Sequence, residues 1–249
     1  MLEAKVIKSR GLELVSIIHF PEVSIDNKTL IFFCHGFVGH KITPHRMLPK
    51  LTQQLTQLGY TVCRTDCIGS GDSEGNEDYM IIEDQIKDYL KVFEILEESY
   101  SWEKIILLGY SMGGTTATLL SNEIDPDGLV LWSPVSDPLW NFQHLLGSER
   151  FQAGMQGNYI SIEGDEVSPK FFENIDQIHP LEIVKKLNIP IRVIHGSHDQ
   201  DVLPINGWLY YHFAKDGKIH IVENAGHTYD DIILQEDLFA KTIEYLNEI

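Results

Sequence analysis

Short apolar runs recur along the chain and are separated by segments in which apolar residues are spaced three or four apart. The runs are rich in Val, Ile, Phe and Leu, which is typical of strands buried on both faces of a sheet. The predicted strands cover residues 4–8, 12–20, 29–35, 60–66, 104–110, 128–134, 189–196 and 218–223. The predicted helices cover residues 47–58, 79–99, 111–122 and 231–248.

Because strands and helices alternate, the pattern predicts βαβ units and an α/β fold with a mostly parallel, twisted sheet and helices on both faces. We expect residues 1–249 to form one domain. Residues 135–180 interrupt the alternation, since they are rich in Trp, Phe, Gln, Gly and Asn and show no clean periodicity. We interpret this stretch as an insertion over one edge of the sheet, a candidate cap or lid.

Charge and cysteine content narrow the function classes. With 19 Lys and Arg against 37 Asp and Glu, the net charge is −18, which argues against nucleic acid and anionic membrane surfaces as partners. Cys34, Cys63 and Cys67 form neither a disulfide framework nor a CxxC pair. The first 20 residues hold no signal-peptide core, and no run approaches the roughly 20 apolar residues that span a bilayer. We therefore expect a cytoplasmic protein with reduced thiols.

Ser111 lies at the centre of the stretch GYSMGG, residues 109–114, between a predicted strand and a predicted helix. The pattern G-x-S-x-G in this position is typical of a nucleophile elbow, a turn so tight that the residues two before and two after the serine must be small. The helix N-terminus also offers free N–H groups to a developing negative charge. The alternative is an ordinary strand-to-helix turn.

A serine nucleophile needs a base, usually a histidine that a carboxylate orients. His227 lies in the loop between the last strand and the last helix, whereas His220 and His212 fall inside elements and are expected to be structural. Asp199 is the first acid after the strand 189–196, and Asp201 is the fallback. The order Ser, Asp, His is the one expected on an α/β-hydrolase sheet. The alternative is that these are plain turn and loop residues.

An oxyanion hole needs two N–H donors. We expect one from the amide of Met112, directly after the serine, and the other from the amide of Phe37. The loop HGFVG at residues 35–39 follows a predicted strand, and its glycines allow the backbone to turn its amides inward. The alternative is a glycine turn that simply leaves the strand.

Five motifs together resemble the α/β-hydrolase superfamily: HGF at 35–37, DCIGSGDS at 66–73, GYSMGG at 109–114, HGSHDQDV at 195–202 and AGH at 225–227. Within it, the chain resembles bacterial carboxylesterases of the feruloyl/cinnamoyl esterase group, and monoacylglycerol lipase-like enzymes come next. The resemblance implies the same catalytic triad, Ser111, Asp199 and His227, and an inserted segment that caps the acyl pocket. Three positions depart from those esterases: Tyr110 and Met112 on either side of the serine, where histidine or glutamine is common, and Ser70 where histidine is common.

In the esterase group, polar side chains of the cap hold ring hydroxyls of the substrate. The resemblance implies this substrate-binding role for Asp137, Gln143 and Tyr159, with Trp140 and Phe142 as apolar walls. The alternative is that they are surface and core residues of a small subdomain.

The sequence thus predicts a serine esterase that acts on a small-molecule carboxylic ester, without cofactor or metal. A zinc site at His195, His198 and Asp199 is disfavoured, because no further ligand completes the set. A homodimer is compatible with the sequence. The same residues also suit a monoacylglycerol lipase, a lysophospholipase or a thioesterase. A non-catalytic binding protein of this fold is the alternative from a different class.

Overall fold

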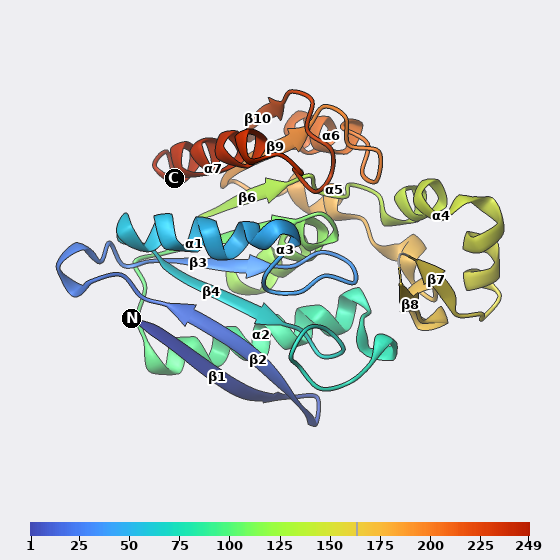
Figure 1. Cartoon of the computed structure of the whole chain (residues 1–249), viewed down its shortest axis with the longest axis horizontal. Coiled ribbons are helices and arrows are strands. Elements are labelled where there is room, and N and C mark those ends of the chain that lie inside the picture. Colours follow the sequence, from blue (N-terminus) through green and yellow to red (C-terminus); the bar gives the residue numbers. More distant parts are fainter. Residues whose placement is uncertain (163) are drawn as a thin grey trace.

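An eight-stranded sheet in the order β1-β2-β4-β3-β5-β6-β9-β10 runs through the molecule (Figure 1). This computed structural model describes residues 1–162 and 164–249. The strands of this sheet are β1 (Leu2–Ser9), β2 (Leu12–His19), β3 (Thr29–Cys34), β4 (Thr61–Asp66), β5 (Lys104–Tyr110), β6 (Gly128–Trp132), β9 (Pro190–Gly196) and β10 (Asp216–Val222). Strand β2 pairs antiparallel with β1 and β4, and all other pairs are parallel. The predicted α/β-hydrolase sheet is confirmed.

Helices cover both faces of the sheet, as predicted (Figure 1). They are α1 (Met47–Gln57), α2 (Ile82–Ser99), α3 (Met112–Ile124), α4 (Pro138–Met155), α5 (Pro180–Val184), α6 (Ile205–Phe213) and α7 (Ile232–Leu246). Strand β3 shows why its sequence is apolar without alternation. Ile31 and Phe33 pack with α1 and α7, whereas Phe32 packs with α2 on the opposite face. Each such side chain contributes about 1.5–3 kcal/mol by leaving water.

The sequence pattern missed helices α4 and α5, and it indicated α6 only as the element that contains His212. In α4, Asp137 caps the N-terminus and Pro138 occupies the first turn, both of which favour a helix. However, Gly147 has φ 72° and interrupts the helix, so no single apolar stripe runs along its length. The other expected elements are present with ends shifted by a few residues, most at α2, which begins at Ile82 after a 3₁₀ turn at Glu77–Tyr79.

The inserted segment, residues 135–180, lies beyond the carboxyl ends of the parallel strands rather than over an edge of the sheet (Figure 1). Besides α4 it holds a small hairpin, β7 (Ile160–Ile162) with β8 (Asp165–Val167), and two 3₁₀ turns, Pro169–Phe172 and Ile175–Gln177. Its phenylalanines form an apolar cluster with the loop after β3. The ring centroid of Phe142 is 4.7 Å from that of Phe37 and 4.6 Å from that of Phe171.

The three cysteines are free and buried. Burial raises the pKa of Cys63 to about 12, and it raises the pKa of Cys34 and Cys67 well above the ordinary value. Since the thiolate is the reactive form, these thiols are inert at neutral pH. Among the helices in the described part of the chain, none combines the length and apolar character needed to cross a membrane.

Candidate active site

Ser111 occupies the turn between β5 and α3 with φ 58° and ψ −126°. A non-glycine residue in such a conformation costs about 1–3 kcal/mol and persists only where its surroundings enforce it. The neighbours do so here. A Cβ atom on Gly113 would lie 2.1 Å from the carbonyl oxygen of Cys34, and one on Gly109 would lie 2.5 Å from the oxygen of Gly113. The glycines therefore let α3 start directly against β3, and the serine side chain is held at the carboxyl edge of the sheet.

The three side chains predicted as a catalytic triad are joined by hydrogen bonds. Nε2 of His227 is 2.9 Å from Oγ of Ser111, and Nδ1 of His227 is 2.7 Å from Oδ2 of Asp199. Because the carboxylate can only accept, Nδ1 carries the proton and Nε2 is free to accept the proton of the serine hydroxyl. The three groups come from the ends of β5, β9 and β10, which meet at one edge of the sheet.

Asp199 is fully buried, yet its carboxylate is well provided with donors. Oδ1 accepts the amides of Asp201 at 3.1 Å and Val202 at 2.8 Å, and Oδ2 lies 3.4 Å from Nε2 of His195. Burial acts to raise the pKa of Asp199, but the interactions with His195 and His227 outweigh it and hold the pKa well below the ordinary value. The group is therefore an anion that orients His227. Asp201, the fallback acid, contributes its amide rather than its carboxylate.

The suggested zinc ligands have other partners. Nε2 of His195 donates to the carbonyl oxygen of Val202 at 2.8 Å, and the amide of His198 donates to Ala225 at 2.9 Å. Within residues 1–162 and 164–249, no group of three or more His, Cys, Asp or Glu side chains is arranged to hold a metal ion.

Tyr110 is a site residue that the sequence analysis treated only as a flank of the serine. Its ring stacks on the imidazole of His227 at 5.1 Å, and its hydroxyl donates to the carbonyl oxygen of His227 at 2.9 Å. Burial raises the pKa of this phenol well above its ordinary value, so it stays a neutral donor. The signal in the sequence that could have pointed to Tyr110 is its position directly before Ser111, at the end of β5.

The loop after β3, residues 35–43 (the β3 loop), packs against the serine. A Cβ atom on Gly36 would lie 3.1 Å from Cβ of Ser111, so the loop backbone approaches closely because Gly36 lacks a side chain. His35 fixes the loop: its Nδ1 donates to Gly36 at 2.9 Å, and its Nε2 accepts the amide of Cys67 at 3.2 Å. Burial lowers the pKa of His35, which keeps it neutral for both contacts. Among the described residues, the amides of Phe37 and Met112 donate to no protein acceptor.

A buried ion pair anchors the far end of the β3 loop. The Lys41 ammonium contacts the fully buried Asp66 carboxylate and also reaches Asp72 at 2.5 Å. Asp66 accepts the amides of Lys41 at 2.6 Å and Asp72 at 2.8 Å as well. The motif at residues 66–73, noted in the sequence only for its resemblance, thus holds the loop that carries the Phe37 amide.

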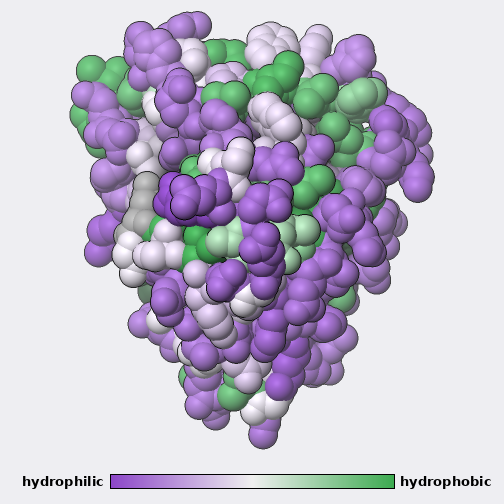
Figure 2. All heavy atoms as spheres, turned by 90° about the vertical axis from the view of Figure 1, so that its right-hand side faces the viewer, coloured by the Kyte–Doolittle hydropathy of each residue, from purple (hydrophilic) through white to green (hydrophobic). Residues whose placement is uncertain are grey.

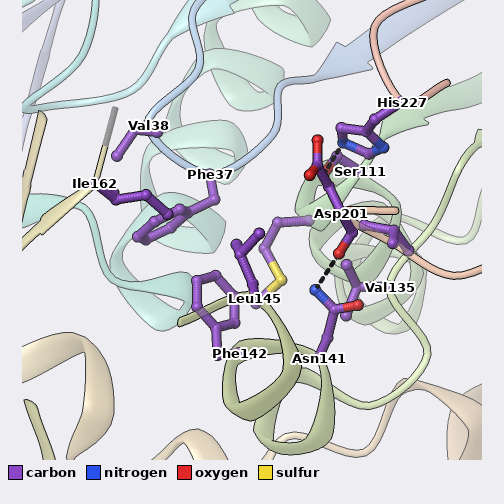
Figure 3. A pocket seen from close by; sticks show the side chains of 12 residues that line it. Phe37, Val38, Ser111, Val135, Asn141, Phe142, Leu145, Ile162, Asp201 and His227 are labelled. Atoms are coloured by element: carbon purple, nitrogen blue, oxygen red, sulfur yellow. Dashed lines mark hydrogen bonds between the residues drawn. The ribbon is translucent and has the colours of Figure 1, made fainter. Parts of the chain in front are cut away.

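Two cavities meet at Ser111 and His227. The first, of about 110 Å³, lies beneath α4 and is lined mainly by apolar side chains, among them Val135, Phe142 and Leu145 (Figure 3). The second, of about 280 Å³, is lined by the β3 loop together with Tyr110, Asp165 and Thr228. Both cavities reach Ser111 and His227, and both also share Phe37, Val38 and Asp201.

The four side chains predicted to bind substrate from the inserted segment line neither cavity. Asp137 caps α4 by accepting the amide of Trp140 at 3.0 Å. Trp140 is 42% exposed and stacks on His144, and Gln143 is exposed. Tyr159 is 49% exposed and donates its hydroxyl to Asp78 at 2.7 Å.

The reason for this correction is helical phase. Asn141, Phe142 and Leu145 share the side of α4 that turns toward Ser111 and line the first cavity, whereas Trp140 and Gln143 lie on the outer side. Phe142 was expected as an apolar wall. Asn141 and Leu145 were missed because the sequence analysis did not predict a helix here. Without a helix it could not tell which side chains share one face.

Comparisons with known proteins bear on the family. A family model described as "Serine aminopeptidase, S33" matches residues 25–157. Esterase EstD of Thermotoga maritima is 24% identical over 169 residues, which cover 61% of this chain and 39% of that protein. Monoglyceride lipase of Homo sapiens is 33% identical over 113 residues, which cover 43% of this chain and 35% of that protein. The chain thus matches well under half the length of these curated relatives.

Solved structures show the same fold. Est1E from Butyrivibrio proteoclasticus, in a structure with bound ferulic acid, aligns with TM-score 0.86 and 22% identity over 98% of this chain and 100% of that chain. A hydrolase from Agrobacterium vitis aligns with TM-score 0.79 and 19% identity over 98% of both chains. At these identities the likeness establishes the fold alone.

Proposed function

We propose that this chain, which belongs to the serine aminopeptidase S33 family, is a serine hydrolase that cleaves carboxylic esters through an acyl-enzyme. The observation that carries the proposal is the hydrogen-bonded sequence from Ser111 through His227 to Asp199, at 2.9 Å and 2.7 Å. A neutral histidine whose Nε2 accepts from a serine hydroxyl is the arrangement that general-base catalysis requires.

In the proposed mechanism, Oγ of Ser111 attacks the ester carbonyl carbon as its proton moves to Nε2 of His227. Asp199 stabilises the resulting imidazolium and keeps it oriented. The imidazolium returns the proton to the leaving alcohol, the C–O bond breaks, and the acyl group stays on Ser111. A water molecule then attacks the acyl-enzyme with His227 again as the base, which releases the acid and restores the serine.

The oxyanion of each tetrahedral intermediate is assigned to the amides of Phe37 and Met112. Two observations support this assignment. Neither amide has another protein acceptor among the described residues, and the Met112 amide belongs to the first turn of α3, where the helix dipole also favours negative charge. The β3 loop is held in place by His35 and Lys41, so these donors are positioned before substrate arrives.

The acyl group is assigned to the apolar cavity beneath α4. Its volume of about 110 Å³ is small beside the roughly 300–1,000 Å³ of typical ligand pockets, which favours short acyl chains or a flat ring over long chains. The face that carries the inserted segment is mostly hydrophilic, as Figure 2 shows, and this suits a dissolved ester better than a lipid surface. The esterase EstD and the Est1E structure with ferulic acid are consistent with this class.

Two competing activities have specific support. Monoglyceride lipases are among the matched relatives, and the family model is described as an aminopeptidase. A lipase of long-chain glycerides needs room for the chain, and an aminopeptidase must act on an amide with a free amino group. Both can be compared with the proposed esterase on one panel of substrates.

The test is hydrolysis of p-nitrophenyl esters from acetate to palmitate, methyl ferulate, an acyl thioester and amino-acid p-nitroanilides. Wild type is assayed beside Ser111→Ala, with Ser101→Ala as the matched control, because Ser101 is an exposed serine that precedes β5, whereas Ser111 follows it. We expect activity to peak on short acyl chains or ferulate, to be lost in Ser111→Ala and to persist in Ser101→Ala. A peak on palmitate, thioesters or p-nitroanilides would replace the esterase with the corresponding class. Absence of hydrolysis on the whole panel would favour a non-catalytic binding protein.

A further inference from the structure

The second cavity, of about 280 Å³, touches the nucleophile but has no role in the proposed acyl site. It is lined by Ser111, Tyr110 and His227 on one side and by the glycine-rich β3 loop on the other. A group leaving from an acyl carbon at Ser111 must depart on the side opposite the acyl pocket. The second cavity is therefore the compartment that receives the alcohol of the ester.

Asp201 gives this compartment its charge. Its side chain is half-buried, lines both cavities and lies on the same side as Ser111 and His227 (Figure 3). Its backbone is fixed, because the amide donates to Asp199 at 3.1 Å and the carbonyl accepts from Asn141 at 3.3 Å. Among the residues that the structure describes, no donor or cation pairs with its carboxylate oxygens. The side chain is thus a positioned anion beside the reacting atoms.

The remaining lining does not balance this charge. The described residues around the cavity include a second carboxylate, Asp165, and neither Lys nor Arg. His40 also lines it, but its Nδ1 accepts the amide of Ile42 at 3.2 Å, which requires that nitrogen to be unprotonated. Lys41 directly follows His40 in the chain, but its ammonium group contacts the Asp66 carboxylate and does not balance the charge of the cavity. The cavity thus presents negative charge to whatever occupies it.

We propose that Asp201 is a specificity-determining residue that recognises a positively charged leaving alcohol, so that esters of amino alcohols are preferred over neutral esters of the same shape. This inference rests on the proposed ester hydrolysis. The ammonium group would bind in the second cavity near the Asp201 carboxylate, while the acyl group occupies the cavity beneath α4. The reaction is unchanged, since the amino alcohol leaves with the proton that His227 returns.

The experiment compares butyrylcholine with 3,3-dimethylbutyl butyrate, in which a carbon replaces the charged nitrogen. Released butyrate is titrated for both, and the readout is the ratio of the two kcat/KM values. Any effect of a variant on the triad itself cancels in this ratio. We expect the wild-type ratio to exceed one by about fivefold, the effect of two unit charges about 4 Å apart in a water-like medium. It should fall toward one as salt is added.

Asp201→Asn keeps the backbone contacts and removes the charge, so we expect it to lower the ratio about fivefold. Asp176→Asn is the matched control, because Asp176 is an exposed aspartate of the inserted segment that lines neither cavity, and the ratio should not change. If Asp201→Asn does not fold, the salt dependence of the wild-type ratio still tests whether charge causes the preference. A mirrored pair, butyl 4-(trimethylammonio)butyrate and butyl 5,5-dimethylhexanoate, places the charge on the acyl side, where we expect a smaller preference for the cation because Asp165 lines only the second cavity.

The outcomes separate the two proposals. No hydrolysis of p-nitrophenyl butyrate by the wild type rejects the esterase and, with it, this inference. Hydrolysis with a choline ratio at or below one, or a ratio that Asp201→Asn and salt leave unchanged, rejects the inference alone. A cation preference on the acyl side that equals or exceeds the preference on the alcohol side also overturns it, because the second cavity would then not be the one that selects the cation.

Discussion

Replacing Lys41 by methionine would remove the cation of the buried pair that anchors the β3 loop. Asp66 has no exposed side-chain surface and Lys41 only 6%, so the carboxylate that remains would be a buried charge without its counter-ion. Breaking such a pair costs about 3–5 kcal/mol. Because Asp66 would still accept the amides of Lys41 and Asp72 at 2.6 Å and 2.8 Å, we expect the lower end, about 3 kcal/mol.

The assay is equilibrium unfolding in urea, followed by fluorescence. With an m-value of about 3 kcal/mol/M, Lys41→Met should lower the midpoint by about 1 M. The matched control is Asp72→Asn, which removes the other carboxylate of Lys41. Since that carboxylate is 71% exposed, its loss should cost about 0–1 kcal/mol. The loop carries the Phe37 amide, so Lys41→Met should also lower kcat about tenfold or more.

A double variant tests the physical reason. Adding Asp66→Asn to Lys41→Met removes the uncompensated charge while keeping an acceptor oxygen for one of the two amides, and should recover part of the lost stability. Equal midpoints for Lys41→Met and Asp72→Asn, or a further loss in the double variant, would refute the reasoning that an unpaired buried charge is responsible.

Three further predictions address other parts of the molecule. Asp199→Asn should lower kcat about 10⁴-fold without unfolding the chain, because an amide cannot hold His227 in the required tautomer, and steady-state kinetics with circular dichroism would check both. Gly113→Ala should lower Tm strongly, since its Cβ would lie 2.1 Å from a carbonyl oxygen of β3, whereas Gly226→Ala, which has open space, should melt like the wild type. Burial and Arg64 lower the pKa of His19 from 6.5 to about 4 in the folded protein. Between pH 6.5 and pH 4 the unfolded state therefore binds more protons than the folded state, so the stability of the fold decreases as the pH drops through this range. His19→Gln should lose less stability than the wild type between pH 7 and pH 4.5 in urea titrations at each pH.

The chemistry of the site was largely predictable from local sequence. The glycines at 109 and 113 are required by one tight turn, and Ser111 follows from them. Asp199 and His227 were predictable because the parallel strands that precede them end at the same edge of the sheet, so the loops that follow these strands come together. In contrast, Tyr110 was passed over, because its stacking on His227 depends on a loop more than 100 residues away.

The inserted segment shows where local reasoning failed. Asp137, Trp140, Gln143 and Tyr159 were chosen for chemical type, yet the structure turns them to solvent or to caps. Which side chains of α4 face the cavity depends on the phase of the helix and on its contact with the aromatic cluster around Phe142. Neither property is encoded in the residue type alone.

The sequence by itself determined the sheet, the tight turn at Ser111 and the order in which Ser111, Asp199 and His227 follow their strands, because strand burial, turn geometry and parallel βαβ connections are set by short-range pattern and handedness. Only the tertiary structure decided which residues share a compartment. The pairing of Lys41 with Asp66, the division of the site into two cavities and the position of Asp201 at both of them all join segments far apart in the chain. Contacts of this kind depend on how finished elements pack, and the packing has no counterpart in any local pattern of residues.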